Sequence, residues 1–179
     1  MKKILLFLAI MVVAVQLNAQ FTRATLQATG LTCAMCSNAI NKALQAKPFI
    51  QSVRADIKNS AFDIVFKENA EVNIDEIRKA VEDAGFGVGN LKLTGNFNEV
   101  KIENDKHVKV GNANFHFLNV SDQVLNGEQT IMVVDKNFLT VKQFKKFSNA
   151  TKMECLQTGK AASCCKDLAP GTRIYHVTI

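Results

Sequence analysis

The chain has 179 residues, of which 47% are hydrophobic and 21% are charged, and its formal net charge is +6 at neutral pH. This length is enough for one domain of ordinary size or for two small ones. The positive charge is mild and scattered along the chain, which argues against a surface that binds nucleic acid.

The first 19 residues predict a secretory signal peptide. Lys2 and Lys3 precede an apolar run from Ile4 to Val15, and Ala19 offers a small residue for cleavage. The run is shorter than the ~20 apolar residues of a membrane span, so no stable membrane anchor is expected after cleavage. A periplasmic or secreted location follows. All five cysteines belong to the mature chain, in a compartment where disulfides are the usual expectation.

Between residues 21 and 94 the period of the apolar residues changes in an orderly way. It predicts, in chain order, a strand at 24–28, a helix at 39–44, two strands of a hairpin at 53–57 and 62–66, a helix at 74–84 and a strand at 88–93. Asn73 with Glu76 predicts the start of the second helix, and Gly85 predicts its end. This order of elements is ferredoxin-like and predicts an α+β fold.

The polar stretch 95–100, GNFNEV, predicts a linker to a second domain at 101–179. The second region is mostly strands, expected at 108–110, 115–117, 131–134 and 175–179. Asn126-Gly127 predicts a hairpin turn, and a capping box at 140–143 predicts one helix. This order suits a small β-rich domain and matches the element order of an OB-like barrel.

Cys33 and Cys36 lie three positions apart at the junction of the first predicted strand and helix. The first turn of a helix favours thiolate over thiol, because its backbone N–H groups and dipole stabilise negative charge. A structural zinc site needs four ligands, and neither a histidine nor a second cysteine pair accompanies these two in the first region. Two thiolates do suffice for a soft ion that accepts near-linear coordination, such as Cu(I). We interpret Met35 as an apolar loop residue, not as a third ligand.

A redox pair is the alternative from a different functional class, a thiol–disulfide oxidoreductase. Thioredoxin-like proteins share a tryptophan before the first cysteine and a cis-proline facing the pair. This chain has no tryptophan, and its two prolines are Pro48 and Pro170. Pro48 follows the helix that carries the pair and cannot easily face it. A resting disulfide between Cys33 and Cys36 also stays open.

Two motifs carry a resemblance to a known family. Residues 30–36 read GLTCAMC and residues 77–88 read IRKAVEDAGFGV, in the same strand order and spacing as a heavy-metal-associated domain. Residues 24–93 resemble this module of copper chaperones, metal-exporting P-type ATPases and the periplasmic mercuric-ion scavenger. The resemblance implies that Cys33 and Cys36 are metal ligands. It also implies that Leu31 packs beneath the loop, and it puts Phe86 where chaperones usually carry a lysine and ATPase domains a phenylalanine.

These observations predict an exported, non-enzymatic protein that captures Cu(I) for transfer or sequestration. Hg(II) and Zn(II) are alternative ions, so a mercuric-ion scavenger stays open. A third class is an adaptor that docks on a metal efflux system. The prediction of metal transfer implies a metal-transporting membrane protein as the partner.

The stretch MECLQTGKAASCC adds Met153, Cys155, Cys164 and Cys165 as a possible second site. Adjacent cysteines rarely bridge each other, because a disulfide demands more separation than neighbouring residues give. A disulfide from Cys155 to either partner is therefore one expectation. A thiolate cluster that binds metal when reduced is the other.

The remaining candidates have less specific interpretations. His107, His116 and His176 fall on different predicted strands, and we interpret each as structural. Lys142, Lys145 and Lys146 lie opposite the apolar face of the predicted helix and are expected to form a solvated surface.

Overall fold

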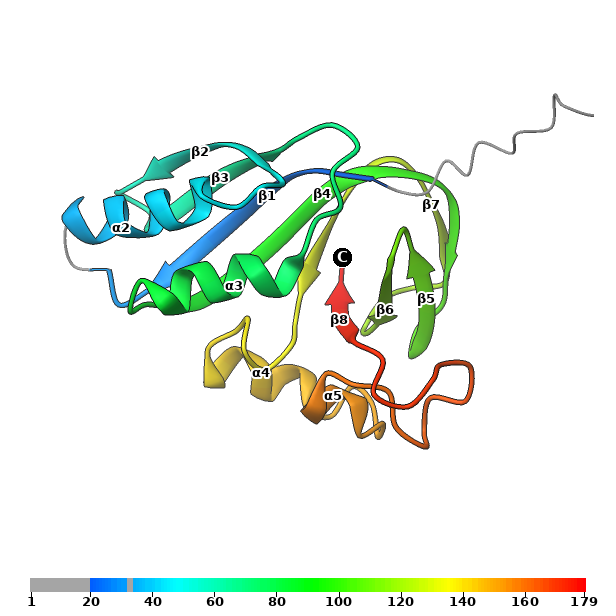
Figure 1. Ribbon diagram of the computed structural model, residues 1–179. Helices are drawn as coiled ribbons and strands as arrows, with labels where there is room; N and C mark the ends of the chain where they lie inside the picture. Colours follow the sequence, from blue (N-terminus) through cyan, green and yellow to red (C-terminus); the bar gives the residue numbers. More distant parts are fainter. Residues whose placement is uncertain (1–19, 32–33) are drawn as a thin grey trace, which may run out of the picture.

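The computed structural model describes residues 20–31 and 34–179. The described strands form one eight-stranded sheet with the order β2-β3-β1-β4-β7-β8-β6-β5 (Figure 1). The strands are β1 (Gln20–Thr29), β2 (Ile50–Asp56), β3 (Ala61–Phe66), β4 (Gly87–Ile102), β5 (Lys106–Val110), β6 (Ala113–Phe117), β7 (Gln123–Val133) and β8 (Ile174–Thr178). The helices are α2 (Ala34–Gln45), α3 (Ile74–Asp83), α4 (Val141–Phe147) and α5 (Cys155–Thr158).

The first half of the chain has the ferredoxin-like arrangement that the sequence predicts. Its strands β2-β3-β1-β4 pair antiparallel, and α2 and α3 lie on the same side of them (Figure 1). Ala24, Leu26 and Ala28 alternate with exposed residues along β1 and are buried, as their spacing predicts. The Asn73 side chain accepts a hydrogen bond from the backbone N–H of Glu76, which confirms the predicted cap of α3.

The linker predicted at 95–100 is wrong, because these residues lie inside β4. Asn96 and Asn98 are exposed and flank the buried Phe97, so the polar residues occupy one face of a strand and do not form a loop. β4 pairs with β1 on one side and with β7 on the other. A Cβ atom at Gly95 would lie 2.6 Å from the carbonyl oxygen of Gln20, so only glycine allows the close approach of β1 there. The regions 21–94 and 101–179 therefore share one sheet.

The hairpin turn and the OB-like barrel are also not found. Asn126 and Gly127 lie within β7, where the pairing with β4 shifts register between Phe97 and Val100. Gly127 has a φ of +70° but lies within β7, opposite Phe97, and the extra residue of the bulge is on β4, where residues 98 and 99 face Asn126. The described strands form an open sheet with β2 and β5 at its edges, and not a closed barrel.

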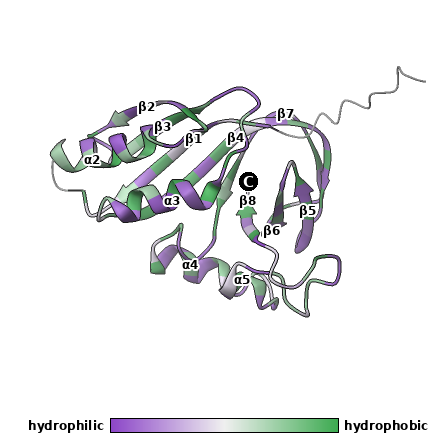
Figure 2. Ribbon diagram, in the orientation of Figure 1, coloured by the Kyte–Doolittle hydropathy of each residue, from purple (hydrophilic) through white to green (hydrophobic). Residues whose placement is uncertain are grey.

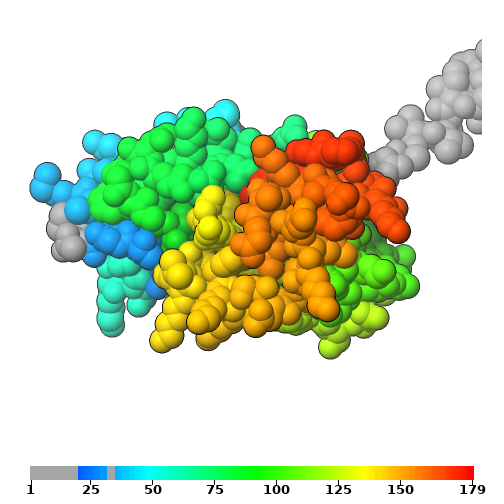
Figure 3. Space-filling view, turned by 90° about the horizontal axis from the view of Figure 1, so that it is seen from below, coloured from blue at the N-terminus to red at the C-terminus, as the bar shows by residue number. Residues whose placement is uncertain are grey.

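The second half of the sheet buries both of its faces. Phe115 and Phe117 of β6 are fully buried in the main core, which they share with β1 and β4. His116 lies between them and points to the opposite face. There α4, α5 and the segment 159–173 supply two smaller apolar clusters. Figure 2 shows the alternation of hydrophilic and hydrophobic residues along the strands, and Figure 3 shows the C-terminal segment (orange to red) adjoining the green and yellow segments.

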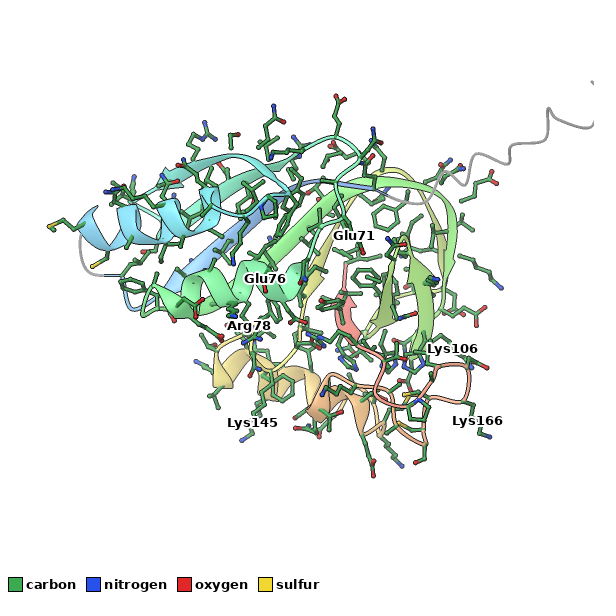
Figure 4. The ribbon with its side chains drawn as sticks, viewed as in Figure 1. Glu71, Glu76, Arg78, Lys106, Lys145 and Lys166 are labelled. Carbon is green, nitrogen blue, oxygen red and sulfur yellow. The ribbon has the colours of Figure 1, made fainter. Side chains whose placement is uncertain are left out.

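The helix at 141–147 has the features that its sequence predicts. The side chain of Thr140 and that of Gln143 cap each other's backbone N–H groups. Lys142, Lys145 and Lys146 are exposed, which confirms the predicted solvated surface, and Figure 4 shows Lys145 pointing away from the sheet. Within the described ranges no helix combines the length and the apolar character that a membrane crossing requires.

Candidate metal centres

The first candidate centre lies at the start of α2. Cys36 is half-buried in the first turn of this helix, where the sequence predicts it. Met35, interpreted from the sequence as an apolar loop residue, is instead the second residue of α2, and its side chain is 83% exposed. The second predicted ligand of this centre, Cys33, lies outside the described residues.

The surroundings of Gly30 and Leu31, which follow β1, are apolar. Gly30 has a φ of +83°, and a Cβ atom added there would lie 3.8 Å from Cδ1 of Phe86, so the Phe86 ring sits against the end of β1. Leu31 and Phe86 are partly buried and pack against the main core. Leucine at position 31 therefore keeps an apolar contact with the core. Phe86 supplies packing here and brings no charge.

The second candidate centre begins with three histidines in one row. His107 of β5 pairs with His116 of β6, and His116 pairs with His176 of β8. Residues directly opposite each other on paired strands share one face of the sheet. Their ring centroids are 4.5 Å apart for His107 and His116, and 5.1 Å apart for His116 and His176.

Cysteine sulfurs lie against these three histidines, on the face of the sheet where α5 packs. Cys155 is the first residue of α5 and is fully buried. Its Sγ atom lies 3.8 Å from Nε2 of His107 and 3.8 Å from Nδ1 of His116. The same sulfur lies 3.4 Å from Nε2 of His176. Cys165 is also buried, with Sγ 3.8 Å from Nε2 of His107 and 3.5 Å from Sγ of the half-buried Cys164.

Carboxylates hold the other nitrogens of two of these imidazoles. Nε2 of His116 lies 2.9 Å from Asp105, and Nδ1 of His176 lies 2.6 Å from Asp135. A carboxylate at one ring nitrogen keeps the proton there and leaves the other nitrogen as a lone-pair donor. In both rings the free nitrogen faces the sulfur of Cys155.

Comparisons with known proteins decide what the first half of the chain is. Residues 25–87 match the model of the heavy-metal-associated domain. These residues form a heavy-metal-associated domain. The chain is 34% identical over 83 residues to the probable copper-transporting ATPase HMA5 of Arabidopsis thaliana, covering 46% of this chain and 8% of that protein.

Further similarities are to a bacterial ATPase and to a solved domain. A copper-transporting ATPase of Helicobacter pylori is 29% identical over 128 residues, covering 72% of this chain and 16% of the relative. The chain therefore spans less than a fifth of the length of these curated relatives. The crystal structure of a copper binding domain from HMA7, a P-type ATPase, is 29% identical, with a TM-score of 0.35, and the match covers 40% of this chain and 92% of that domain.

An ionic network joins the heavy-metal-associated domain to the histidine row. Arg173 donates to Asp135 at 2.7 Å and to both oxygens of Asp75 on α3, at 2.8 and 3.1 Å. Tyr175 donates to Asp75 at 3.1 Å, and its ring lies 4.0 Å from the guanidinium carbon of Arg173. Because Asp135 also contacts His176, the network runs from α3 to the second centre.

Burial sets the protonation of the second centre. It lowers the pKa of His116 to about 4 and that of His107 below its usual value, so both rings are neutral at pH 7. Burial also raises the pKa of Cys155, which keeps this thiol protonated in the absence of a metal. A metal bound there must displace the thiol proton.

The structure corrects one expectation about this region and adds an arrangement that the sequence did not predict. The three histidines lie on different strands, as predicted, but side by side. Cys155, Cys164 and Cys165 are free cysteines, so the predicted disulfide from Cys155 is not present and the alternative, a thiol cluster, is what the structure shows. Met153 is partly buried against this cluster.

A signal for the histidines was present in the sequence. His116 stands between Phe115 and Phe117, and His176 stands between Tyr175 and Val177. In an alternating strand this places both histidines on the face opposite the large apolar residues. The pattern does not say which strands are neighbours, so it could not bring the histidines together.

Proposed function

We propose that this chain is an exported metal-binding protein whose heavy-metal-associated domain captures Cu(I) with the thiolates of Cys33 and Cys36. The observation that carries this proposal is a heavy-metal-associated domain with a cysteine in the first turn of α2 and a second cysteine three positions before it. Two curated relatives named as copper-transporting ATPases support copper as the ion. The role is capture for transfer or sequestration, without catalysis of a reaction.

The chemistry of the pair suits an ion that is passed on. Two thiolates satisfy Cu(I) without further ligands, and a third thiol from a partner can join before one of the first two leaves. Met35, exposed beside Cys36, shows that the start of α2 faces solvent. A metal-transporting membrane protein is the partner that this chemistry serves. Hg(II) also favours two thiolates in line, so it is tested beside Cu(I).

Replacing Cys33 and Cys36 with serine should remove one equivalent of tight Cu(I) binding from the full chain and leave the fold intact. The measurement is an anaerobic titration of the reduced protein against a chromogenic Cu(I) chelator, repeated with Hg(II) and Zn(II). Met35→Leu is the matched control and should bind like the parent, because a side chain that points to solvent is not a ligand. A double variant that keeps the stoichiometry and affinity of the parent for Cu(I) would place the site elsewhere.

Export should remove the first 19 residues. The motivation is the order of Lys2 and Lys3, an apolar run and Ala19. The intact mass of the protein recovered from outside the cytoplasm is the measurement, and it should correspond to a chain that begins at Gln20. A recovered chain that still carries Met1 would contradict the proposal.

A further inference from the structure

We propose that Cys155, together with two or three of His107, His116, His176 and Cys165, binds one thiophilic d¹⁰ ion, Cu(I) or Zn(II), and so forms a second metal centre. This centre lies in the C-terminal half and uses none of the ligands of the heavy-metal-associated domain. It is independent of the function proposed for Cys33 and Cys36.

The distances from Sγ of Cys155 to the imidazole nitrogens suit ligands of one ion, and the donor atoms of His107, His116 and Cys155 all lie within 4.8 Å of one another. A thiolate binds such an ion at about 2.3 Å and an imidazole nitrogen at about 2.0 Å. With trigonal or tetrahedral angles, this places sulfur and nitrogen about 3.5 to 3.7 Å apart. The distances from Sγ of Cys155 to the three imidazole nitrogens are 3.4 to 3.8 Å.

The three imidazoles are also oriented as ligands. Each turns one ring nitrogen toward the sulfur of Cys155. The opposite nitrogens of His116 and His176 are held by Asp105 and Asp135. Carboxylates in this position fix the tautomer and raise the basicity of a metal-bound imidazole.

Burial argues against a purely structural role for these groups. His116, His176 and Cys155 are fully buried, and Cys165 is 2% exposed. A thiol is a weak hydrogen-bond donor and a weak acceptor, so contacts of 3.4 and 3.8 Å to sulfur compensate poorly for the lost hydration of the buried imidazole nitrogens of His116 and His176. Coordination bonds to a metal ion would satisfy these nitrogen atoms.

The donor set selects the class of ion. Thiolate and imidazole suit Cu(I) and Zn(II), whereas Mg²⁺ and Ca²⁺ require oxygen ligands. Asp105 and Asp135 are each directed at an imidazole nitrogen. For each thiol that binds the ion, Cys155 alone or with Cys165, the S–H bond breaks, a metal–sulfur bond forms, the proton goes to solvent and no electron is transferred.

Cys164 gives the centre a route to the surface. It is half-buried, and its sulfur forms a second group with those of Cys155 and Cys165, in which all three lie within 4.8 Å of one another. Cys155 belongs to this group and also to the group with His107 and His116. Lys106 and Lys166, the sequence neighbours of His107 and Cys165, are exposed at the outer edge of this half (Figure 4).

The test uses the full mature chain with Cys33→Ser and Cys36→Ser, so that only the second centre remains. The reduced protein is titrated anaerobically with Cu(I) and, in a separate arm, with Zn(II), each against a chromogenic chelator. We expect one equivalent of one of these ions to bind, and the arm in which it binds identifies the ion. Cys155→Ser in this background should weaken binding by about 100-fold or more, since loss even of an outer-shell partner costs about 10- to 100-fold.

The matched control is Met153→Leu, which changes a neighbour of the cluster that is not among the proposed ligands and should bind like its parent. Because the chain has only three histidines, ¹⁵N NMR of the imidazole rings provides a readout that needs no ligand variant. At least two rings should show the nitrogen shift of metal coordination on addition of one equivalent of ion. Imidazole signals that do not respond to either ion, or unchanged affinity in the Cys155→Ser protein, would overturn the proposal.

Discussion

Replacing Phe115 with alanine should lower the free energy of unfolding of the whole chain by about 4 kcal/mol, the range measured for large-to-small changes of a buried phenylalanine. Phe115 is fully buried, and its ring centroid lies 5.8 Å from that of Phe21 and 5.8 Å from that of Tyr175. Phe21 is on β1 of the first half, and Tyr175 is on β8 of the second. The cavity would therefore weaken packing between the halves as well as within one of them.

Urea unfolding followed by circular dichroism measures this loss of stability, and hydrogen exchange locates it. Exchange should accelerate in β1 and β3 as well as in β6 and β8, because β4 joins both halves in one sheet. Val141→Ala, at a side chain that is 89% exposed, is the control and should change stability by no more than about 0.5 kcal/mol. Faster exchange confined to residues 101–179 would show instead that the two halves unfold separately.

Replacing Arg173 with methionine should cost about 3 kcal/mol, because it leaves two partly or fully buried carboxylates without their cation. The carboxyl of Asp75 is 35% exposed and that of Asp135 is 7% exposed, and both contact the guanidinium. Burial alone would raise the pKa of Asp75, but the hydrogen bonds and charge of Arg173 hold it below its usual value. The stabilisation by Asp75 is thus present above the ordinary carboxyl pKa and is lost as the pH falls through the lowered value.

The cost of Arg173→Met should accordingly be large at neutral pH and smaller near about pH 3, where the Asp75 carboxyl of the variant takes up a proton. Urea unfolding at both pH values measures the difference. Arg54→Met is the matched control. It removes a cation that lies 2.7 Å from Asp63 on the surface, where the Arg54 side chain is 85% exposed, and it should change stability little. Equal costs for the two variants would contradict a role for Arg173 in joining α3 to β8.

The features predicted well from sequence are those encoded by a few contiguous residues. The cap at Asn73, the capping box at Thr140 and the helical stripe that buries Ile40 and Leu44 are such features. Each depends on side chains within one or two turns of the chain, so no knowledge of distant neighbours is needed. The resemblance of residues 24–93 to a heavy-metal-associated domain has the same origin, because each of its two motifs is a short contiguous stretch.

The predictions that were wrong rest on sequence patterns that are compatible with two different local structures. The polarity of 95–100 suits a linker, but Asn96 and Asn98 are also the solvent-facing residues of a long strand. Asn126-Gly127 suits a hairpin turn, but Gly127 adopts its positive φ inside β7, opposite a bulge of β4. In both cases the neighbouring strand with which the segment pairs decides between the two structures, and for β7 that strand is β4.

By itself the sequence determined the ferredoxin-like half, its CxxC pair and the presence of further thiols near the end of the chain. Only the tertiary structure decided that His107, His116 and His176 form one row facing Cys155. The reason is that strand register is a nonlocal property: β6 pairs in parallel with β8, across the whole of β7, α4 and α5. A histidine in an alternating strand shows which face it occupies, but the neighbouring strands determine what it meets there.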